Sequence, residues 1–401
     1  MWLLHSSTYE LKEFFGENIP RYAILSHVWD GEDVSFRDVR KDLEAAKHKA
    51  GFSKIRDCCA QAKKDSLEWV WIDSCCIDKR SSAELSEAIN SMFKWYRRAR
   101  ICYAFLADVF DVGYNAAPDL TDQFSKSRWF TRGWTLQELI APRRIRFFSN
   151  SWKLIGAKSS MKKHSEFVDK ISVITKIGFQ FLTGGRLEMA SVAERMSWAS
   201  SRQTTREEDI AYSLMGLFDV NMPVLYGEGG EKAFERLQIE IMGTIADHSI
   251  FAWRANSAYE TGPLAISPAD FAHGGAITVS AEDSSDIRPF SLTNAGLEIN
   301  LPISMPSGQF GTQVIARLNC SFRPLTGEKR QPLGIHLAII SDPWTTSVPS
   351  CRRRKCDELV TLDSNSSTWK RADIMILTDV HMRHRKEICG QRRADRISVV
   401  E

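Results

Sequence analysis

The sequence predicts a chain of three parts: an α/β domain over residues 1–150, a helical extension over 151–253 and a β-rich domain over 254–401. Three observations predict this order. Short apolar runs alternate with segments of helical periodicity in the first part, helical periodicity dominates the second, and apolar and polar residues alternate in the third. A length of 401 residues is also more than one ordinary domain accounts for.

Four apolar runs in the first part are expected to be strands, with helices between them. The strands are expected at 21–29, 67–77, 100–109 and 144–149, and the helices at 51–66, 81–99 and 127–140. The second of these helices begins with a capping box, because Ser81 and Glu84 have the required spacing. Strands that alternate with helices indicate a parallel sheet covered on both faces, and such sheets bind ligands at the carboxyl ends of their strands. The loops after Val28, Asp73 and Ala107 are therefore the expected place for chemistry.

Periodicity alone identifies the two later parts. Apolar residues recur at helical spacing between 151 and 253, as at Phe234, Leu237 and Ile241, so a helical layer is expected that packs on the first domain or extends it. After residue 254 apolar and polar residues alternate, as in "AGLEINLPI" at 295–303. An antiparallel sandwich or barrel is expected there.

The composition argues against several classes of protein. The net charge of +3 gives no reason to expect nucleic acid, and no run approaches the roughly 20 apolar residues of a membrane span. The nine cysteines include the pairs Cys58-Cys59 and Cys75-Cys76 and follow no disulfide framework, so reduced thiols are expected. Because the amino terminus has no signal-peptide core, a cytoplasmic protein is expected. No metal is expected, since the carboxy-terminal cysteines and histidines lack the spacing of zinc sites. These residues are Cys351, Cys356, His381, His384 and Cys389.

Three stretches of the first part resemble, in order and spacing, the fungal heterokaryon incompatibility (HET) domain. They are "YAILSHVWDGEDVSF" at 22–36, "WVWIDSCCIDKRSSAELSEAINSMFKWYRRARICYAFLADV" at 69–109 and "SRWFTRGWTLQELIAP" at 127–142. Residues 191–242 and 247–253 resemble the segment that commonly follows this domain. One position departs from the family: Asp30 stands where Gly usually follows Trp29, which changes the charge of that loop.

The resemblance implies a function in fungal self/non-self recognition, in which the domain triggers programmed cell death. It also implies self-association through the HET domain and leaves room for a separate sensor protein as partner. Many members of the family add a nucleotide-binding switch and a repeat array, but this sequence contains no GxxxxGK[ST] loop and no repeat of solenoid or propeller period. The chain is therefore expected to be a stand-alone effector or a part of an array whose partner senses the signal.

The HET domain is in turn distantly similar to the TIR domain, whose fold is flavodoxin-like and several of whose members cleave NAD. In NAD-cleaving plant TIR domains a Ser-x-Trp-Cys-x-x-Glu pattern carries the catalytic glutamate. Here Trp134 precedes Glu138 by the same interval, with Thr135 in place of the cysteine. This similarity implies a flavodoxin-like (TIR-like) first domain, no cofactor, NAD as the substrate and Glu138 as the catalytic residue.

Glu138 also suits this chemistry on physical grounds. On a continuous helix over 127–140 its neighbours are Trp134, one turn back, and Phe130, two turns back. A carboxylate beside two rings would be partly desolvated, with a raised pKa. Cleavage of a nicotinamide glycosidic bond needs little acid catalysis, but a fixed carboxylate stabilises the oxocarbenium-like ribose. The alternative is a structural ion pair between Glu138 and Arg132, Arg143 or Arg144 at an end of the helix.

Further candidates lie at the expected ends of the first two strands. The predicted substrate-binding set is Ser26, His27, Trp29, Asp73, Asp78 and Trp134. His27 is suited to a ligand phosphate or to general base catalysis, and Asp73 to a ribose hydroxyl. Each also has an ordinary alternative, namely a structural histidine and an aspartate that caps its own loop.

Two functions of different classes therefore stay open. The first is a TIR-like enzyme that hydrolyses NAD and is switched on by self-association. The second is a non-catalytic module whose homotypic contacts recruit a death pathway. A third hypothesis, a cysteine hydrolase, would need Cys75 or Cys76 within hydrogen-bond reach of His27, although a free cysteine is more often a small buried hydrophobe.

Overall fold

The computed structural model describes most of the chain, which divides into two compact units. The described residues are 1–29, 31–110, 120–160, 165–255, 262–279, 288–304, 313–324, 329–340, 348–362 and 369–378. The first unit comprises Met1–Met189 and Ser201–Ala233, and the second comprises Ala190–Ser200 and Phe234–Glu401. Among the residues discussed above, those outside the described ranges are Asp30, His381, His384 and Cys389. Within these ranges, no helix combines the length and the apolar character needed to cross a bilayer.

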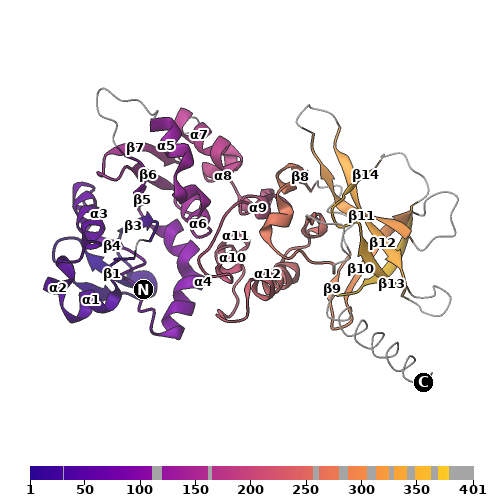
Figure 1. The fold of residues 1–401 in the computed structure, drawn as a ribbon, viewed down its shortest axis with the longest axis horizontal. Helices are drawn as coiled ribbons and strands as arrows, with labels where there is room; N and C mark the ends of the chain where they lie inside the picture. Colours follow the sequence, from indigo (N-terminus) through magenta and orange to yellow (C-terminus); the bar gives the residue numbers. More distant parts are fainter. Residues whose placement is uncertain are drawn as a thin grey trace, which may run out of the picture. The chain divides into compact units, whose positions relative to one another are not determined.

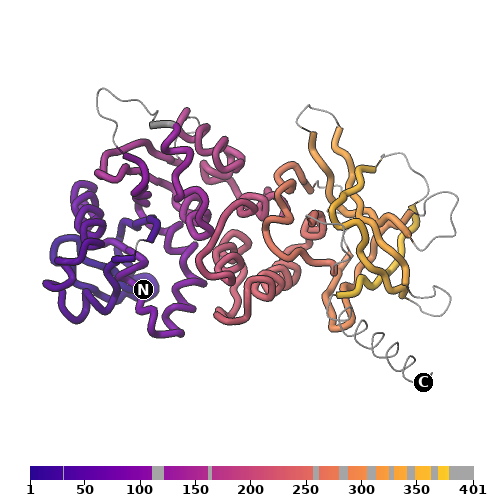
Figure 2. Tube along the Cα trace, in the orientation of Figure 1, coloured from indigo at the N-terminus to yellow at the C-terminus, as the bar shows by residue number. Residues whose placement is uncertain are grey.

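The first unit is built on a mixed sheet in the order β2-β1-β4-β3-β5-β6-β7 (Figures 1 and 2). Its strands are β1 (Trp2–His5), β2 (Leu11–Glu13), β3 (Tyr22–His27), β4 (Trp69–Trp71), β5 (Ile101–Phe105), β6 (Arg144–Phe148) and β7 (Leu154–Ser159). β3 is parallel to β4 and β5, and β5 is parallel to β6, whereas β1, β2 and β7 pair antiparallel at the margins. Every residue of β3 is buried, as befits a central strand covered on both faces. The predicted α/β first part with a central sheet is confirmed.

Helices cover both faces of this sheet. Those up to β6 are η1 (Gly16–Asn18), α1 (Phe36–Lys41), α2 (Leu43–Lys47), α3 (Phe52–Lys64), α4 (Ser82–Arg98), α5 (Leu120–Lys126), η2 (Arg128–Thr131) and α6 (Thr135–Ile140). In Figure 1, α3 lies on one side of the strands, and α4 and α6 lie on the other. α4 begins after Ser81, whose hydroxyl accepts a hydrogen bond from the Glu84 amide at 3.2 Å. The predicted capping box is incomplete, because the Glu84 carboxylate instead accepts from the Asp78 amide at 2.8 Å and so closes the preceding loop.

The predicted continuous helix over 127–140 is wrong. Arg128–Thr131 form a 3₁₀ turn, and α6 begins only at Thr135. Between them the chain pairs with a distant segment, since the Gly133 amide donates a hydrogen bond to the Gln203 carbonyl at 2.8 Å. A pairing between residues far apart in the sequence leaves no local periodicity, so the interruption of the helix could not be predicted from the sequence pattern.

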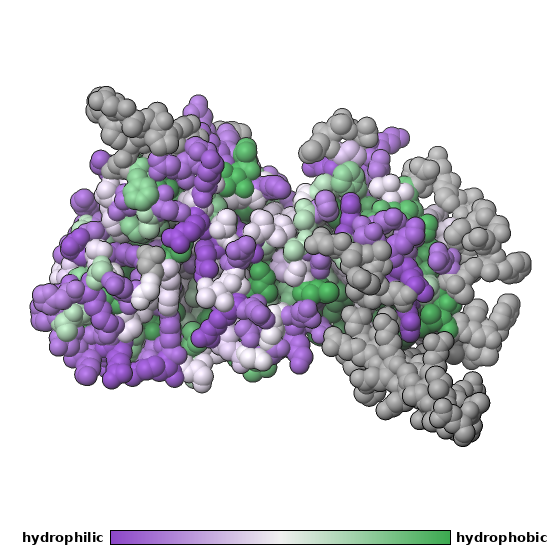
Figure 3. Space-filling view, viewed as in Figure 1, coloured by the Kyte–Doolittle hydropathy of each residue, from purple (hydrophilic) through white to green (hydrophobic). Residues whose placement is uncertain are grey.

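Short helices complete the first unit. They are α7 (Glu166–Thr175), α8 (Phe179–Leu182), η3 (Leu187–Met189), α10 (Asp209–Tyr212) and α11 (Met215–Phe218). α11 packs so closely on α4 that a Cβ atom at Gly216 would overlap the side chain of Phe93. On the face drawn in Figure 3, hydrophilic side chains predominate over this unit, and apolar ones form scattered spots.

The second unit combines helical segments with a β-sheet. Its helical segments are α9 (Val192–Ser197), most of α12 (Gly230–Thr244), η4 (His248–Phe251), η5 (Pro268–Phe271) and η6 (Gly274–Ala276). Its strands are β8 (Ile277–Thr278), β9 (Ser291–Leu292), β10 (Leu297–Ser304), β11 (Gln313–Phe322), β12 (Gln331–Ile339), β13 (Ser350–Arg354), β14 (Val360–Thr361) and β15 (Lys370–Ile376). All but β9 follow the order β14-β12-β13-β15-β10-β11-β8, and β9 pairs with β10. The predicted β-rich carboxy-terminal region is confirmed.

Candidate active site

The carboxyl group of Glu138 is buried at the carboxyl end of β3. Glu138 lies on α6 and is 7% exposed. The hydroxyl of Ser26, the penultimate residue of β3, donates a hydrogen bond to this carboxylate and accepts one from the indole N–H of Trp129 at 2.8 Å. The hydroxyl of Tyr96 also adjoins the carboxylate and donates to the Leu25 carbonyl at 2.9 Å. Groups from β3, α4 and η2 thus surround one acid.

Burial dominates the ionisation of Glu138 and raises its pKa to about 8. The hydrogen bond from Ser26 opposes this rise, Asp73 adds to it, and the positive charge of Arg202 opposes it. Arg202 is itself buried, and its guanidinium donates to the Arg132 carbonyl at 2.8 Å. With such a pKa, the protonated form of the acid predominates at pH 7. An approaching cation would favour the ionised form.

The indole N–H that reaches Ser26, the residue hydrogen-bonded to Glu138, belongs to Trp129, which was expected on the core face. The prediction assumed one continuous helix, on which Trp129 faces the core and Trp134 faces the acid. Because the helix is interrupted before α6, Trp129 reaches Ser26, whereas Trp134 hydrogen-bonds to Asp209. The aromatic surroundings of the acid were expected, but the residue that supplies the hydrogen bond was not.

His27 points to the other face of β3, because successive residues of a strand alternate between faces. Its Nε2 lies 3.8 Å from the nearer Asp33 oxygen, and its Nδ1 lies 3.6 Å from Oδ1 of Asp73. Both distances exceed those of hydrogen bonds. Among the described residues, neither ring nitrogen nor this Asp73 oxygen has a hydrogen-bond partner. Burial lowers the pKa of His27, so a neutral imidazole offers a donor and an acceptor to a polar ligand at pH 7.

Trp29 forms the exposed margin of this site. Its indole N–H donates to Asp73 Oδ2 at 2.6 Å, and the residue is 46% exposed. The Lys79 ammonium lies 3.0 Å from the centroid of the indole ring. Asp73 therefore connects the two faces of β3, since it holds Trp29, faces His27 and acts electrostatically on Glu138.

The other predicted residues make their contacts elsewhere. The Asp78 carboxylate is paired with Arg80 at 2.7 Å, as in the loop-capping alternative. Burial and the adjacent Cys76 thiol raise the pKa of Cys75, with the hydrogen bond from Cys76 as the largest cause. Because neither nitrogen of His27 has a hydrogen-bond partner in the described part of the chain, the nucleophile–base pair of a cysteine hydrolase is not formed there.

Sequence reasoning missed three residues around Glu138. Tyr96 and Trp129 occupy apolar stripes in a helical projection, so they look like ordinary core positions. Arg202 lies in the segment 191–242, whose resemblance to a sequence that follows HET domains was its only signal.

Residues 22–111 match the family model described as heterokaryon incompatibility protein (HET), and residues 232–263 match a domain of unknown function, DUF8212. The chain is 49% identical over 234 residues to the vegetative incompatibility protein HET-E-1 of Podospora anserina. This match covers 57% of the chain and 17% of that relative's length. No solved structure matches significantly.

Proposed function

Because residues 22–111 form a heterokaryon incompatibility (HET) domain, we propose that this chain is an effector of fungal vegetative incompatibility that triggers programmed cell death on non-self recognition. The similarity to HET-E-1 supports a role in that process. The proposal extends to mechanism: the first unit hydrolyses NAD when it self-associates, with Glu138 as the catalytic residue.

The order of the parallel strands supports a flavodoxin-like, TIR-like domain. Taken along the chain, β3, β4, β5 and β6 lie in the spatial order second, first, third, fourth. This is the order in flavodoxin-like sheets, which bind their ligand between the first and third strands. The corresponding point lies between β3 and β5, where Ser26 pairs with Ala104 and His27 with Phe105. Ser26 is the residue that binds the Glu138 carboxylate.

The proposed reaction is the hydrolysis of one glycosidic bond of NAD. The bond between ribose C1′ and nicotinamide N1 breaks, its electron pair goes to nicotinamide, and nicotinamide leaves as a neutral molecule. Water adds to C1′ and one proton is released. The Glu138 carboxylate would stabilise the positive ribose, and the positive nicotinamide ring of NAD would favour its ionised form. Trp29 offers an exposed ring for stacking, and His27 and Asp73 offer polar groups to the ribose or phosphates.

One observation carries this proposal: a buried acid, hydrogen-bonded to Ser26, at the carboxyl end of the parallel strands β3 and β5. A structural carboxylate is more commonly exposed or paired with a cation at short distance. A carboxyl group with a raised pKa beside a cluster of polar groups is typical of an active site.

The test is incubation of the purified protein with NAD and chromatography of nicotinamide and ADP-ribose. The assay is run on the chain alone and on a fusion to an oligomerising coiled coil. We expect nicotinamide release that E138Q reduces by about 100-fold or more, the range found when a charge-stabilising group is removed. E87Q is the matched control, because Glu87 is exposed on α4. The mechanism is refuted if oligomerised protein releases no nicotinamide, or if E138Q and E87Q behave alike.

A homotypic interaction module is the second candidate function, and a groove on the first unit favours it. Phe124, Val173 and Ile174 line a groove of about 430 Å³ together with Ser125, Glu166, Asp169 and Lys170, and Val173 is 81% exposed. A second copy of the chain is the proposed occupant. In fungal cells, death that persists in E138Q but is lost in V173E would favour this module over the enzyme.

A further inference from the structure

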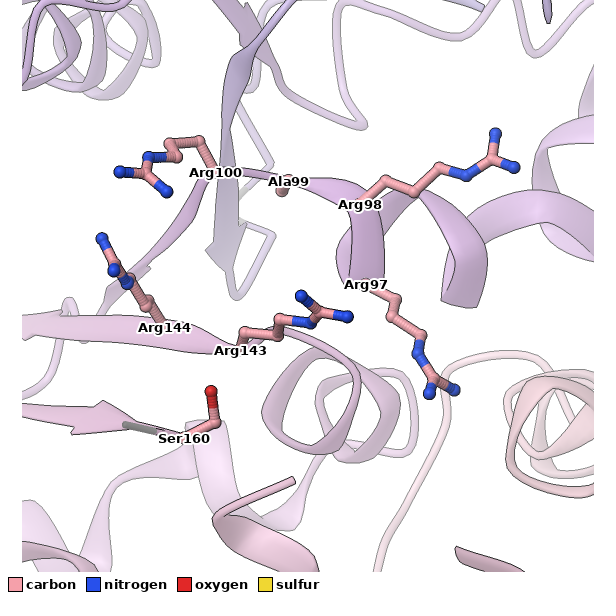
Figure 4. Close-up of a pocket in the computed structure, with 7 residues that line it drawn as sticks. All are labelled: Arg97, Arg98, Ala99, Arg100, Arg143, Arg144 and Ser160. Atoms are coloured by element: carbon pink, nitrogen blue, oxygen red, sulfur yellow. The ribbon is translucent and has the colours of Figure 1, made fainter. Parts of the chain in front are cut away.

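Five arginines and a serine surround a pocket of about 650 Å³ in the first unit (Figure 4). They are Arg97, Arg98, Arg100, Arg143, Arg144 and Ser160, and we name this site the arginine pocket. In Figure 4, the side chains of Arg100 and Arg144 extend to one side and approach each other, Arg143 extends to the other side toward the end of α4, and Arg98 is directed away.

Three chain segments converge to form the arginine pocket. α4 ends at Arg98, and Arg100 directly precedes β5. β5 and β6 are parallel neighbours in which Cys102 pairs with Ile145, so Arg100 and Arg143 stand side by side two residues earlier. The Ser160 amide donates to the Arg143 carbonyl at 2.9 Å, which brings the end of β7 to the same place.

The arginine pocket lies at the opposite edge of the sheet from Glu138. Ser26, which binds that acid, pairs with Ala104 near the carboxyl end of β5, whereas Arg100 stands before its amino end. The length of β5 therefore separates the two places. The proposed active site does not account for the arginine pocket.

Four of the five arginines in the arginine pocket have no acidic partner in the described part of the chain. None of the lining residues is acidic, and Arg97, Arg98, Arg100 and Arg143 form no salt bridge with any residue in the described ranges. Elsewhere on β6, by contrast, Arg146 is paired with Asp65 at 2.7 Å. Because like charges in a shared concavity repel, a bound anion would stabilise this arrangement.

We propose that the arginine pocket binds a small molecule that carries several phosphate groups. Guanidinium groups bind phosphate oxygens through paired N–H donors, and several phosphates are needed to engage several arginines at once. The volume is that of a small-molecule site. Among the described residues, the lining contains no aromatic ring to stack on a base and no large apolar residue to enter a bilayer, which favours a small polyphosphate over nucleic acid or a membrane.

The test is titration calorimetry of the full chain with inorganic tripolyphosphate at about 0.15 M salt, where weak surface attraction is largely screened. We expect saturable binding that R100Q/R143Q weakens at least tenfold. R37Q/R56Q removes the same charge from exposed positions outside the arginine pocket and is expected to change the affinity less than twofold. Absence of saturable binding, or equal losses in the two double variants, would overturn the proposal.

Two further comparisons separate this site from its alternatives. E138Q is expected to bind tripolyphosphate like the wild type, whatever the outcome of the NAD assay. Single-stranded RNA and anionic phospholipid vesicles are titrated in parallel. If either binds through Arg100 and Arg143 while tripolyphosphate does not, the ligand class proposed here is wrong.

Discussion

At the scale of the residue, Glu138 makes stability depend on pH. Its pKa is about 8 in the folded chain against an ordinary value of 4.5, and burial is the main cause. A pKa that folding raises means that the folded state holds the proton more tightly. The contribution is therefore fully favourable below pH 4.5 and is lost as the pH rises to about 8. The difference between the two values corresponds to a loss of about 5 kcal/mol.

The variant E138Q is not expected to lose stability in this way as the pH rises, because an amide does not ionise. It retains an oxygen that can accept the hydrogen bond from Ser26. Relative to the wild type, the midpoint of thermal unfolding of E138Q should rise steadily between pH 5 and pH 8. Calorimetry or circular dichroism at four pH values measures this, and E87Q should follow the wild type throughout. Parallel curves for E138Q and the wild type would mean that the acid is ionised in the folded chain at neutral pH.

The environment of Glu138 was only partly predictable. The alternation of strands and helices placed the acid near the strand ends, and the nearby aromatic residues suggested a raised pKa. The contact of the Trp129 indole with Ser26 follows from the interruption before α6, where the chain pairs with Gln203. Contacts between residues far apart in the sequence leave no local pattern, so Trp129 could not be distinguished from a core residue.

At the scale of the element, the junction between η2 and α6 positions the acid. The Gly133 amide donates to Gln203, and the Gln203 amide donates to the Thr131 carbonyl at 2.7 Å. A Cβ atom at position 133 would lie only 2.5 Å from the methyl group of Thr204. Glycine is therefore needed here because of a close approach, and α6 can start at an angle that directs Glu138 toward Ser26.

The variant G133A is expected to lower the free energy of unfolding by about 1–3 kcal/mol through overpacking against Thr204. The double variant G133A/T204S removes the obstructing methyl group and should recover part of the loss. Chemical denaturation monitored by tryptophan fluorescence measures both variants. G31A is the control, because a Cβ atom there meets nothing within 4 Å. Equal losses in G133A and G133A/T204S would locate the strain elsewhere.

Some secondary-structure elements could be predicted from sequence patterns and others could not. The four parallel strands were predicted because strands buried on both faces are continuous apolar runs. β1, β2 and β7 were missed, since they are marginal strands, β2 is largely polar and exposed, and β7 has only one fully buried residue. Such strands are held by pairing with their neighbours, as β7 is with β6, and their own sequence carries little signal.

At the scale of the whole molecule, the candidate active site and the arginine pocket belong to one unit. The division of the chain at residues 150 and 253 stays a prediction. Both compact units are discontinuous in sequence, since Ala190–Ser200 belongs to the second unit and Ser201–Ala233 belongs to the first. Each unit has its own sheet and its own buried side chains, so each is expected to unfold as a cooperative body.

Arg353 offers a way to perturb the second unit alone. It lies on β13, is 1% exposed, and its guanidinium lies 3.7 Å from the centroid of the Trp253 ring. The guanidinium donates to the Phe251 carbonyl at 3.0 Å and to the Trp253 carbonyl at 2.7 Å. A buried cation thus satisfies two carbonyl groups that come from η4 and the residues after it.

The variant R353M is expected to destabilise the second unit by about 2–4 kcal/mol, because it leaves two buried carbonyl groups without donors. Hydrogen exchange followed by mass spectrometry should show reduced protection of β10–β13, while protection of β3, β4 and β5 stays at the wild-type level. R330M is the control, since Arg330 is exposed. If R353M keeps the first unit intact, it should also keep any NAD hydrolysis, because every residue of the proposed active site lies in that unit. A loss of protection across both sheets would show that the chain unfolds as a single body.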